Sequence, residues 1–190
     1  GGVFLKKTWI IVLAVLALLV FSGIGSYNSL VGLNENVDGK WSQVETQLQR
    51  RADLIPNLVA TVKGYAAQEK DILNNIADAR SRLMGAQGAA DKAAANDALS
   101  SSLSRLLVVV ENYPNLKSDA NFRQLQDELA GTENRLAVSR KDYNDAVQVY
   151  NARIKTFPNV IWSNMMGFGP REYFEAESGA KEVPKVDFDK

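Results

Sequence analysis

The fold is decided by residues 41–62, WSQVETQLQRRADLIPNLVATV, in which apolar residues recur at alternating steps of three and four. The recurring residues are Trp41, Val44, Leu48, Ile55, Leu58 and Val62. Residues spaced in this way lie on one face of an α-helix, and such an apolar stripe is typical of helical bundles and coiled coils. The segment therefore predicts an amphipathic helix that packs against other helices.

The apolar stripe extends beyond this segment in both directions. It begins at Val37 and continues through Tyr65, Ile72, Ile76, Ala79 and Leu83. Pro56 lies within it, and because a proline removes one backbone hydrogen bond, we expect it to kink the helix without ending it. Arg51 and Glu69 stand at stripe positions where an apolar side chain is expected.

Two further helical segments follow. Residues 84–90 are small and contain glycine, which predicts a turn. The second stripe, which Pro114 is expected to end, consists of Leu99, Leu103, Leu106, Val110 and Tyr113. Ser118 is the expected N-cap of the last long helix. The apolar residues of that helix fall at intervals of seven: Phe122, Leu129, Leu136, Tyr143, Tyr150 and Phe157.

These patterns predict an all-α fold, because period-two alternation extends over no useful length before residue 180. We expect an elongated antiparallel bundle of two long helices and a shorter one, with a short helix after Pro158. The expected divisions are an N-terminal anchor or assembly helix (1–26), a helical bundle (27–169) and an extended tail (170–190). The tail is expected either to pack an aromatic side chain onto the bundle or to remain mobile.

An uncharged segment, residues 9–25, follows directly after Lys6 and Lys7 and is rich in leucine, isoleucine, valine and alanine. Its length is near the lower end of the roughly 17–25 residues that span a membrane. A cleaved signal peptide has a similar pattern, but a retained, single-pass anchor is the favoured interpretation. The chain begins Gly1-Gly2 without methionine, which suggests trimming or a start within the reading frame.

The flanking charges predict an orientation for this anchor. Lys6 and Lys7 precede it, and no lysine or arginine follows until Lys40. Because lysine and arginine favour the cytoplasmic side, we expect the helical body on the non-cytoplasmic side of the cell membrane.

Composition excludes several kinds of site. Lysine plus arginine equals aspartate plus glutamate, 22 of each, so no net field attracts nucleic acid. Cysteine and histidine are absent, which removes thiolate nucleophiles, Cys/His zinc sites, lipid-modified cysteine and the usual proton shuttle. The serines at 100, 101, 102 and 104 have no histidine base and are interpreted as helix surface. We expect no catalytic site, metal, cofactor, nucleic acid or small-molecule substrate.

Charged side chains supply the candidate interaction sites. They are Arg50, Arg51, Asp53, Glu69, Glu133 and Arg140. Arg51 could bind a carboxylate or phosphate of a partner. The favoured interpretation is an ion pair within the bundle, with Glu133 as the candidate partner. Glu69 and Arg140 are interpreted in the same way, as residues that fix helix register.

A short apolar patch follows the last long helix and consists of Trp162, Met165, Met166 and Phe168. Burial is the favoured interpretation, whereas an exposed patch of this kind would mark a surface for a partner.

Several longer motifs resemble one known family. Near the start they are YNSLV (27–31), WSQVE (41–45), QRRADLIPNLV (49–59) and KGY (63–65). Near the end they are Tyr143-Asn144, Tyr150-Asn151, Phe157-Pro158, Gly167-Phe168 and Tyr173-Phe174-Glu175. Together they resemble the LemA family. The resemblance implies a bacterial, single-pass membrane protein with a helical-bundle body and no assigned biochemical activity.

Three functional hypotheses follow. The favoured one is a membrane-anchored interaction or scaffold protein that associates with other copies or with another protein. The alternative is a structural subunit that assembles into a ring, tube or filament through its apolar N-terminal helix, since apolar helices in lipid and in assembly cores look alike. An enzyme is disfavoured, because only carboxylates and tyrosines such as Glu69 and Tyr65 could act.

Overall fold

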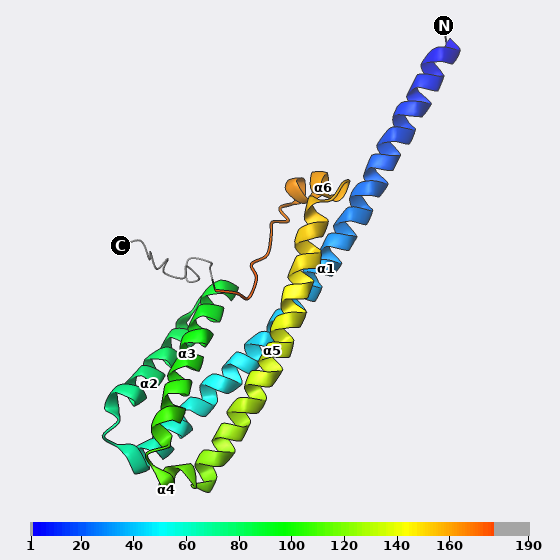
Figure 1. Ribbon diagram of the computed structural model, residues 1–190. Helices are drawn as coiled ribbons and strands as arrows, with labels where there is room; N and C mark the ends of the chain where they lie inside the picture. The colour runs from blue at the N-terminus through cyan, green and yellow to red at the C-terminus, as the bar shows by residue number, and fades with distance from the viewer. Residues whose placement is uncertain (1, 177–190) are drawn as a thin grey trace, which may run out of the picture. The chain divides into compact units, whose positions relative to one another are not determined.

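The computed structural model describes residues 2–176 of the chain. Those residues form helices and no strand, so the all-α prediction is confirmed (Figure 1). The helices are α1 (Gly2–Ala66), α2 (Lys70–Gly85), α3 (Ala89–Val110), α4 (Pro114–Lys117), α5 (Ala120–Lys155) and α6 (Asn159–Met166).

The described chain divides into two compact units. The first unit contains residues 2–41 and 142–171, and the second contains residues 42–141 and 172–176. The helices α1 and α5 each have one part in the first unit and the other part in the second unit.

α1 is one helix of 65 residues. It runs unbroken across residues 26 and 27, where the sequence suggested a division between anchor and bundle, and that division stays a prediction. The helix also continues past Pro56, whose side chain is exposed, as expected for a proline that does not end a helix. The predicted kink at that proline stays a prediction.

The turn between α1 and α2 was not predicted. We expected one helix along the stripe from Val37 to Leu83, but α1 ends at Ala66 and α2 begins at Lys70. The turn is held by a distant tyrosine: Gln68 Nε2 donates to the Tyr113 hydroxyl at 2.8 Å, and that hydroxyl donates to Glu69 Oε1 at 2.9 Å. Apolar spacing continues in phase on both sides, so the periodicity did not reveal the turn.

The second unit is a bundle of antiparallel neighbours. Along the chain, α2 reverses the direction of α1, and α3 reverses that of α2 (Figure 1). The turn between α2 and α3 comprises residues 86–88, which confirms the turn predicted within residues 84–90. Gly88 adopts a positive φ of 82°, a backbone conformation that residues with a Cβ rarely adopt.

Apolar side chains from every helix of the second unit fill its core. The buried ones include Val44, Leu48, Ile55, Leu58, Val62, Leu73, Ile76, Leu83, Leu99, Leu106, Leu116, Phe122, Leu129 and Leu136. Each such leucine, isoleucine or phenylalanine stabilises the fold by about 1.5–3 kcal/mol when removed from water. Most residues of the predicted stripes are among them, whereas Tyr65 is 42% exposed.

The start of α5 differs from the prediction by one residue. The backbone amide of Phe122 donates to Asp119 Oδ1 at 2.9 Å, which makes Asp119 the N-cap. The Ser118 hydroxyl donates instead to the carbonyl of Asn115. Aspartate and serine are comparable caps, so local preference alone could not separate the two.

The core of the first unit joins α1 to the C-terminal part of α5. Leu30, Val37, Tyr143, Val147, Tyr150 and Ile154 are buried there. Trp41 lies against Tyr143 with ring centroids 5.0 Å apart. Phe157, the last residue of the predicted heptad series, is 80% exposed because α5 ends at Lys155 and its helical phase ends there.

Residues 172–176 return to the second unit. Phe174 is fully buried, and the guanidinium of Arg140 lies 5.1 Å from the centroid of its ring. Glu172 Oε2 accepts a hydrogen bond from the first backbone amide of α3, Ala89. The rest of the tail predicted for residues 170–190, from residue 177 onward, lies outside the described residues.

Candidate functional site

The N-terminal part of α1 exposes an apolar surface on all sides. Large apolar side chains from Val3 to Ile24 are 42–83% exposed. Within the described residues, α1 is the one helix long and apolar enough to cross a membrane. Water disfavours so large an apolar surface, so the arrangement requires lipid or protein around it.

The predicted apolar patch is only partly buried. Trp162 is half-buried against α1, where its ring would lie 3.2 Å from a Cβ placed on Gly23, and its Nε1 donates to Ser22 Oγ at 3.4 Å. Phe168 meets Tyr27 edge-on, with ring centroids 6.0 Å apart. Met165 and Met166, in contrast, are 73% and 41% exposed. The two aromatic side chains are therefore half-buried and the two methionines are exposed, so no residue of the patch is fully buried.

Arg51 is buried in the second unit. Its two terminal nitrogens donate to Asn96 Oδ1 and, at 2.9 Å, to Ser100 Oγ, both on α3. Its Nε is buried without a hydrogen-bond partner among the described residues. Burial lowers the pKa of Arg51, and the negative charges of Glu133 and Asp97 oppose that change.

In the described residues, Arg51 does not form the ion pair with Glu133 that the sequence suggested. Its hydrogen-bond acceptors are neutral, and Glu133 is exposed and acts on it through charge alone. Sequence reasoning missed Asn96 and assigned Ser100 to the helix surface. The sequence feature that could have revealed these partners is the small polar residue at every fourth position of α3, on the side that contacts the buried arginine.

Arg140 and Glu69 also make contacts within the second unit. Arg140 Nη1 lies 3.9 Å from Asp97 Oδ1, and the guanidinium of Arg140 lies over the ring of Phe174. Glu69 accepts the Tyr113 hydroxyl, whereas Tyr65 donates to Asp119 Oδ2 at 2.6 Å. Glu69 and Tyr65, considered above as a possible catalytic pair, therefore have different partners.

These hydrogen bonds to carboxylates change the pKa of both tyrosines. The bond to Asp119 raises the pKa of Tyr65, and the bond to Glu69 raises the pKa of Tyr113. The pKa of Asp119 is lowered by the Tyr65 hydroxyl and by the Phe122 amide. A tyrosine whose pKa is raised stays protonated near neutral pH, and both hydroxyls already donate to carboxylates at helix ends.

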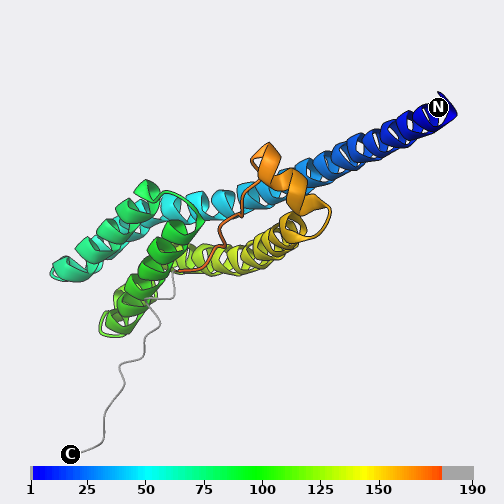
Figure 2. The same ribbon diagram turned by 90° about the horizontal axis from the view of Figure 1, so that it is seen from above.

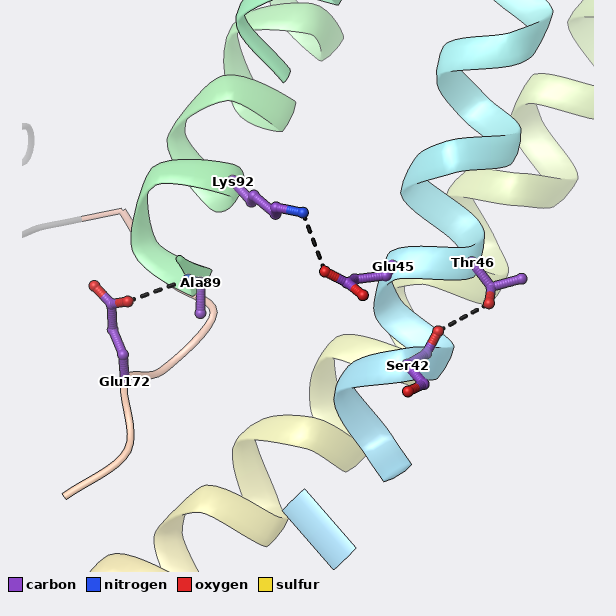
Figure 3. A network of polar contacts seen from close by, with 6 residues as sticks. All are labelled: Ser42, Glu45, Thr46, Ala89, Lys92 and Glu172. Carbon is purple, nitrogen blue, oxygen red and sulfur yellow. Dashed lines mark hydrogen bonds and ion pairs between the residues drawn. The ribbon is translucent and has the colours of Figure 1, made fainter. Parts of the chain in front are cut away.

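A groove of about 780 Å³ lies in the second unit beside α1. Its lining includes Arg50 and Asp53, which are exposed, together with Glu45 and Lys92. Lys92 Nζ lies 3.1 Å from Glu45 Oε1 in an ion pair that joins α3 to α1 (Figure 3). Two basic and two acidic side chains balance, so the groove presents no net charge that would select an anion.

Arg171 is a further residue that sequence reasoning did not single out. In the first unit its guanidinium donates to Asn34 Oδ1 at 2.8 Å and lies 2.7 Å from Asp38 Oδ1. Its backbone amide donates to Asn151 Oδ1 at 2.7 Å, and its carbonyl accepts from the same amide side chain. These bonds attach the chain after α6 to both α1 and α5.

The described residues contain no group of three or more histidine, cysteine, aspartate or glutamate side chains that could hold a metal ion. The polar side chains described above form hydrogen bonds and ion pairs with one another. The apolar surface of α1 is the largest exposed apolar surface of the described residues, and α6 also exposes apolar side chains.

The chain is similar to several named proteins over most of its length. The chain is 29% identical to Magnetosome protein MamQ 2 of Paramagnetospirillum magneticum, over 93% of this chain and 75% of that protein. It is 28% identical to Magnetosome protein MamQ of Magnetospirillum gryphiswaldense, over 92% and 74% respectively. It is 24% identical to Protein LemA of Metamycoplasma hominis, over 92% and 78%.

None of these names specifies an enzymatic activity. With the apolar helix α1, the relatives indicate a membrane-associated protein. The family model for LemA matches residues 40–188, which is most of the sequence. The chain therefore belongs to the LemA family.

Proposed function

We propose that this protein is a membrane-anchored scaffold that presents a helical bundle to other proteins. The observation that supports the proposal most directly is α1, a single helix whose first part exposes apolar side chains on all sides and whose last part packs into the second unit. The relatives named magnetosome proteins fit a role of this kind at a membrane.

The anchor is proposed to cross the membrane once, through residues 9–25. The lysines before it favour a body on the non-cytoplasmic side. The partners of the body are proposed to be other copies of this chain, another protein, or both. No nucleic acid or small-molecule substrate is part of the proposal.

A second function is a self-assembling subunit. The same exposed surface, Val3 to Ile24, could be covered by the corresponding helices of other copies in a ring, tube or filament. The two functions differ in what surrounds α1, which makes them separable by experiment.

The anchor is tested with charged residues placed in the apolar span of the full-length protein. Each lysine near the centre of a membrane helix opposes insertion by roughly 3 kcal/mol. We expect Leu13→Lys with Leu16→Lys to release the protein from membranes washed at alkaline pH, whereas the unaltered chain stays bound. Leu107→Lys with Val108→Lys, at exposed apolar positions of α3, is the matched control and should remain bound. Release of the unaltered chain would exclude a membrane anchor.

Electron microscopy of gently extracted full-length protein separates the two functions. Small, separate particles that need detergent support the anchored scaffold. Large regular rings or filaments that the lysine variants abolish would instead establish assembly through the apolar helix.

A further inference from the structure

α6 has its polar and apolar faces reversed relative to a helix in water. Its buried residues are the polar Asn159 and Ser163, and the Ser163 hydroxyl donates to the carbonyl of Ile154 at 2.9 Å. Its exposed residues include Ile161 at 48% and Met165 at 73%. A helix that faces water places these residue types the other way round, so the exposed face of α6 is suited to an apolar environment.

The sequence on both sides of α6 lacks charge. Residues 156–170 contain no lysine, arginine, aspartate or glutamate. Phe157, just before the helix, is 80% exposed and adds to the apolar surface. Two exposed basic residues, Arg153 and Lys155, come immediately before this stretch. Apolar side chains beside basic ones are typical of helices that lie at the surface of a membrane with anionic lipids.

α6 lies next to the C-terminal end of the apolar span. Trp162 packs on Gly23 and Phe168 on Tyr27, all within the first unit, and both views of the molecule place α6 beside α1 (Figures 1 and 2). Tyr27 follows Trp9 by 18 residues. That is about 27 Å of helix, close to the roughly 30 Å hydrocarbon thickness of a bilayer.

The aromatic side chains fit the two surfaces of such a bilayer. Trp9 is 65% exposed near one end of the span, and Tyr27, Trp162 and Phe168 gather near the other. Tryptophan and tyrosine concentrate at membrane–water interfaces because their rings are apolar and carry one polar group.

We propose that α6 is a lipid-binding helix that lies in the membrane interface where α1 leaves the bilayer. Phe157, Ile161 and Met165 enter the acyl boundary, and Arg153 and Lys155 contact lipid phosphates. The inference rests on the proposed membrane anchor and adds a second, shallow contact with the same leaflet. Such a contact would restrain the tilt and rotation of α1 and thereby orient the body of the protein.

The absence of cysteine allows a direct test with single labelled cysteines in the full-length protein. Met165→Cys reports on α6, Leu16→Cys on the middle of the apolar span, and Val108→Cys on the second unit. Val108 is the matched control, because it is 73% exposed, as Met165 is. Each variant carries a polarity-sensitive fluorophore and is reconstituted in vesicles of phosphatidylcholine and phosphatidylglycerol, with quenchers attached near the headgroup or near the acyl-chain end.

The proposal predicts a different depth for each position. The Met165 label should emit as in an apolar environment and be quenched most by the shallow quencher. The Leu16 label should be quenched most by the deep one, and the Val108 label by neither. Restoring water-like emission at Met165 when Phe157 and Ile161 are both changed to serine would support the same surface.

Three results would overturn it. A Met165 label that behaves like the Val108 label, while Leu16 stays deep, would exclude α6 from the membrane and leave the anchor intact. An apolar but unquenched Met165 label whose signal depends on the protein-to-lipid ratio would indicate coverage by a second copy. If the quencher near the acyl-chain end does not quench the Leu16 label, the proposed function itself fails.

Discussion

At the scale of single residues, the feature that most needs an explanation is the buried arginine of the second unit. Arg51 is 2% exposed, and α3 offers it two neutral acceptors, Asn96 and Ser100. A buried charge with hydrogen bonds but no close opposite charge stabilises a fold little in itself, yet its removal leaves its partners without bonds. Its bonds to α3 make it suited to fixing the register of α1 against α3, whereas the sequence suggested an ion pair with Glu133.

Changing Arg51→Ala should lower the free energy of unfolding by about 2–4 kcal/mol, because Asn96 and Ser100 lose their donor and a cavity forms. Thermal unfolding of the detergent-solubilised protein, followed by circular dichroism, measures the change. Its neighbour Arg50 is exposed, so Arg50→Ala should stay within roughly 0.5 kcal/mol of the unaltered protein. Equal losses in the two variants would contradict a specific role for the buried arginine.

At the scale of elements, helix ends are fixed by side chains that are distant in sequence. Tyr113, from the segment between α3 and α4, binds both Gln68 and Glu69 in the turn before α2. Asp119 caps α5 and also accepts the Tyr65 hydroxyl from the end of α1. Each connection therefore depends on two or three helices at once.

Asp119→Ala should lower the melting temperature by a few degrees at neutral pH, because both the cap and the tyrosine contact are lost. Asp119→Asn keeps an oxygen that can cap and should recover most of the loss. The folded-state pKa of Asp119 is lowered, so its ionised form contributes stability above its ordinary pKa, and that contribution is lost as the pH falls through the lowered value.

The difference in melting temperature between Asp119→Ala and the unaltered protein should therefore shrink in strong acid. Melting curves recorded from neutral to strongly acidic pH test this sign. A difference that grows with acidity would show that the aspartate does not act through its ionised form.

At the scale of the whole molecule, the proposed topology follows from two lysines and one apolar helix. The absence of cysteine again provides the measurement, because each introduced thiol is unique. Ser101 on α3 is exposed and lies in the second unit. In intact cells, a membrane-impermeant maleimide should label Ser101→Cys, whereas Gly2→Cys should require permeabilisation.

The reverse labelling pattern would place the body in the cytoplasm. Such a result would leave the fold and the anchor unchanged and would show that the lysines at 6 and 7 do not determine the orientation. Labelling of both positions in intact cells would mean that the chain does not cross the membrane.

The sequence by itself determined that the protein is all-α, where most of its core lies and which segment is apolar enough for a membrane. Periodicity carries this information, because a helix repeats its buried face every three to four residues. It also placed the turn before α3 and the heptad series from Phe122 to Tyr150. The roles of the charged candidate residues stay predictions.

Only the tertiary structure decided the turn between α1 and α2, the neutral partners of Arg51 and the reversed faces of α6. Each depends on contacts between residues more than forty positions apart, or on which side of a short helix meets a neighbour. Apolar spacing on both sides of residues 67–69 is the same whether the chain continues or turns back. The choice is made by the Tyr113 hydroxyl and by core burial, which no local pattern records.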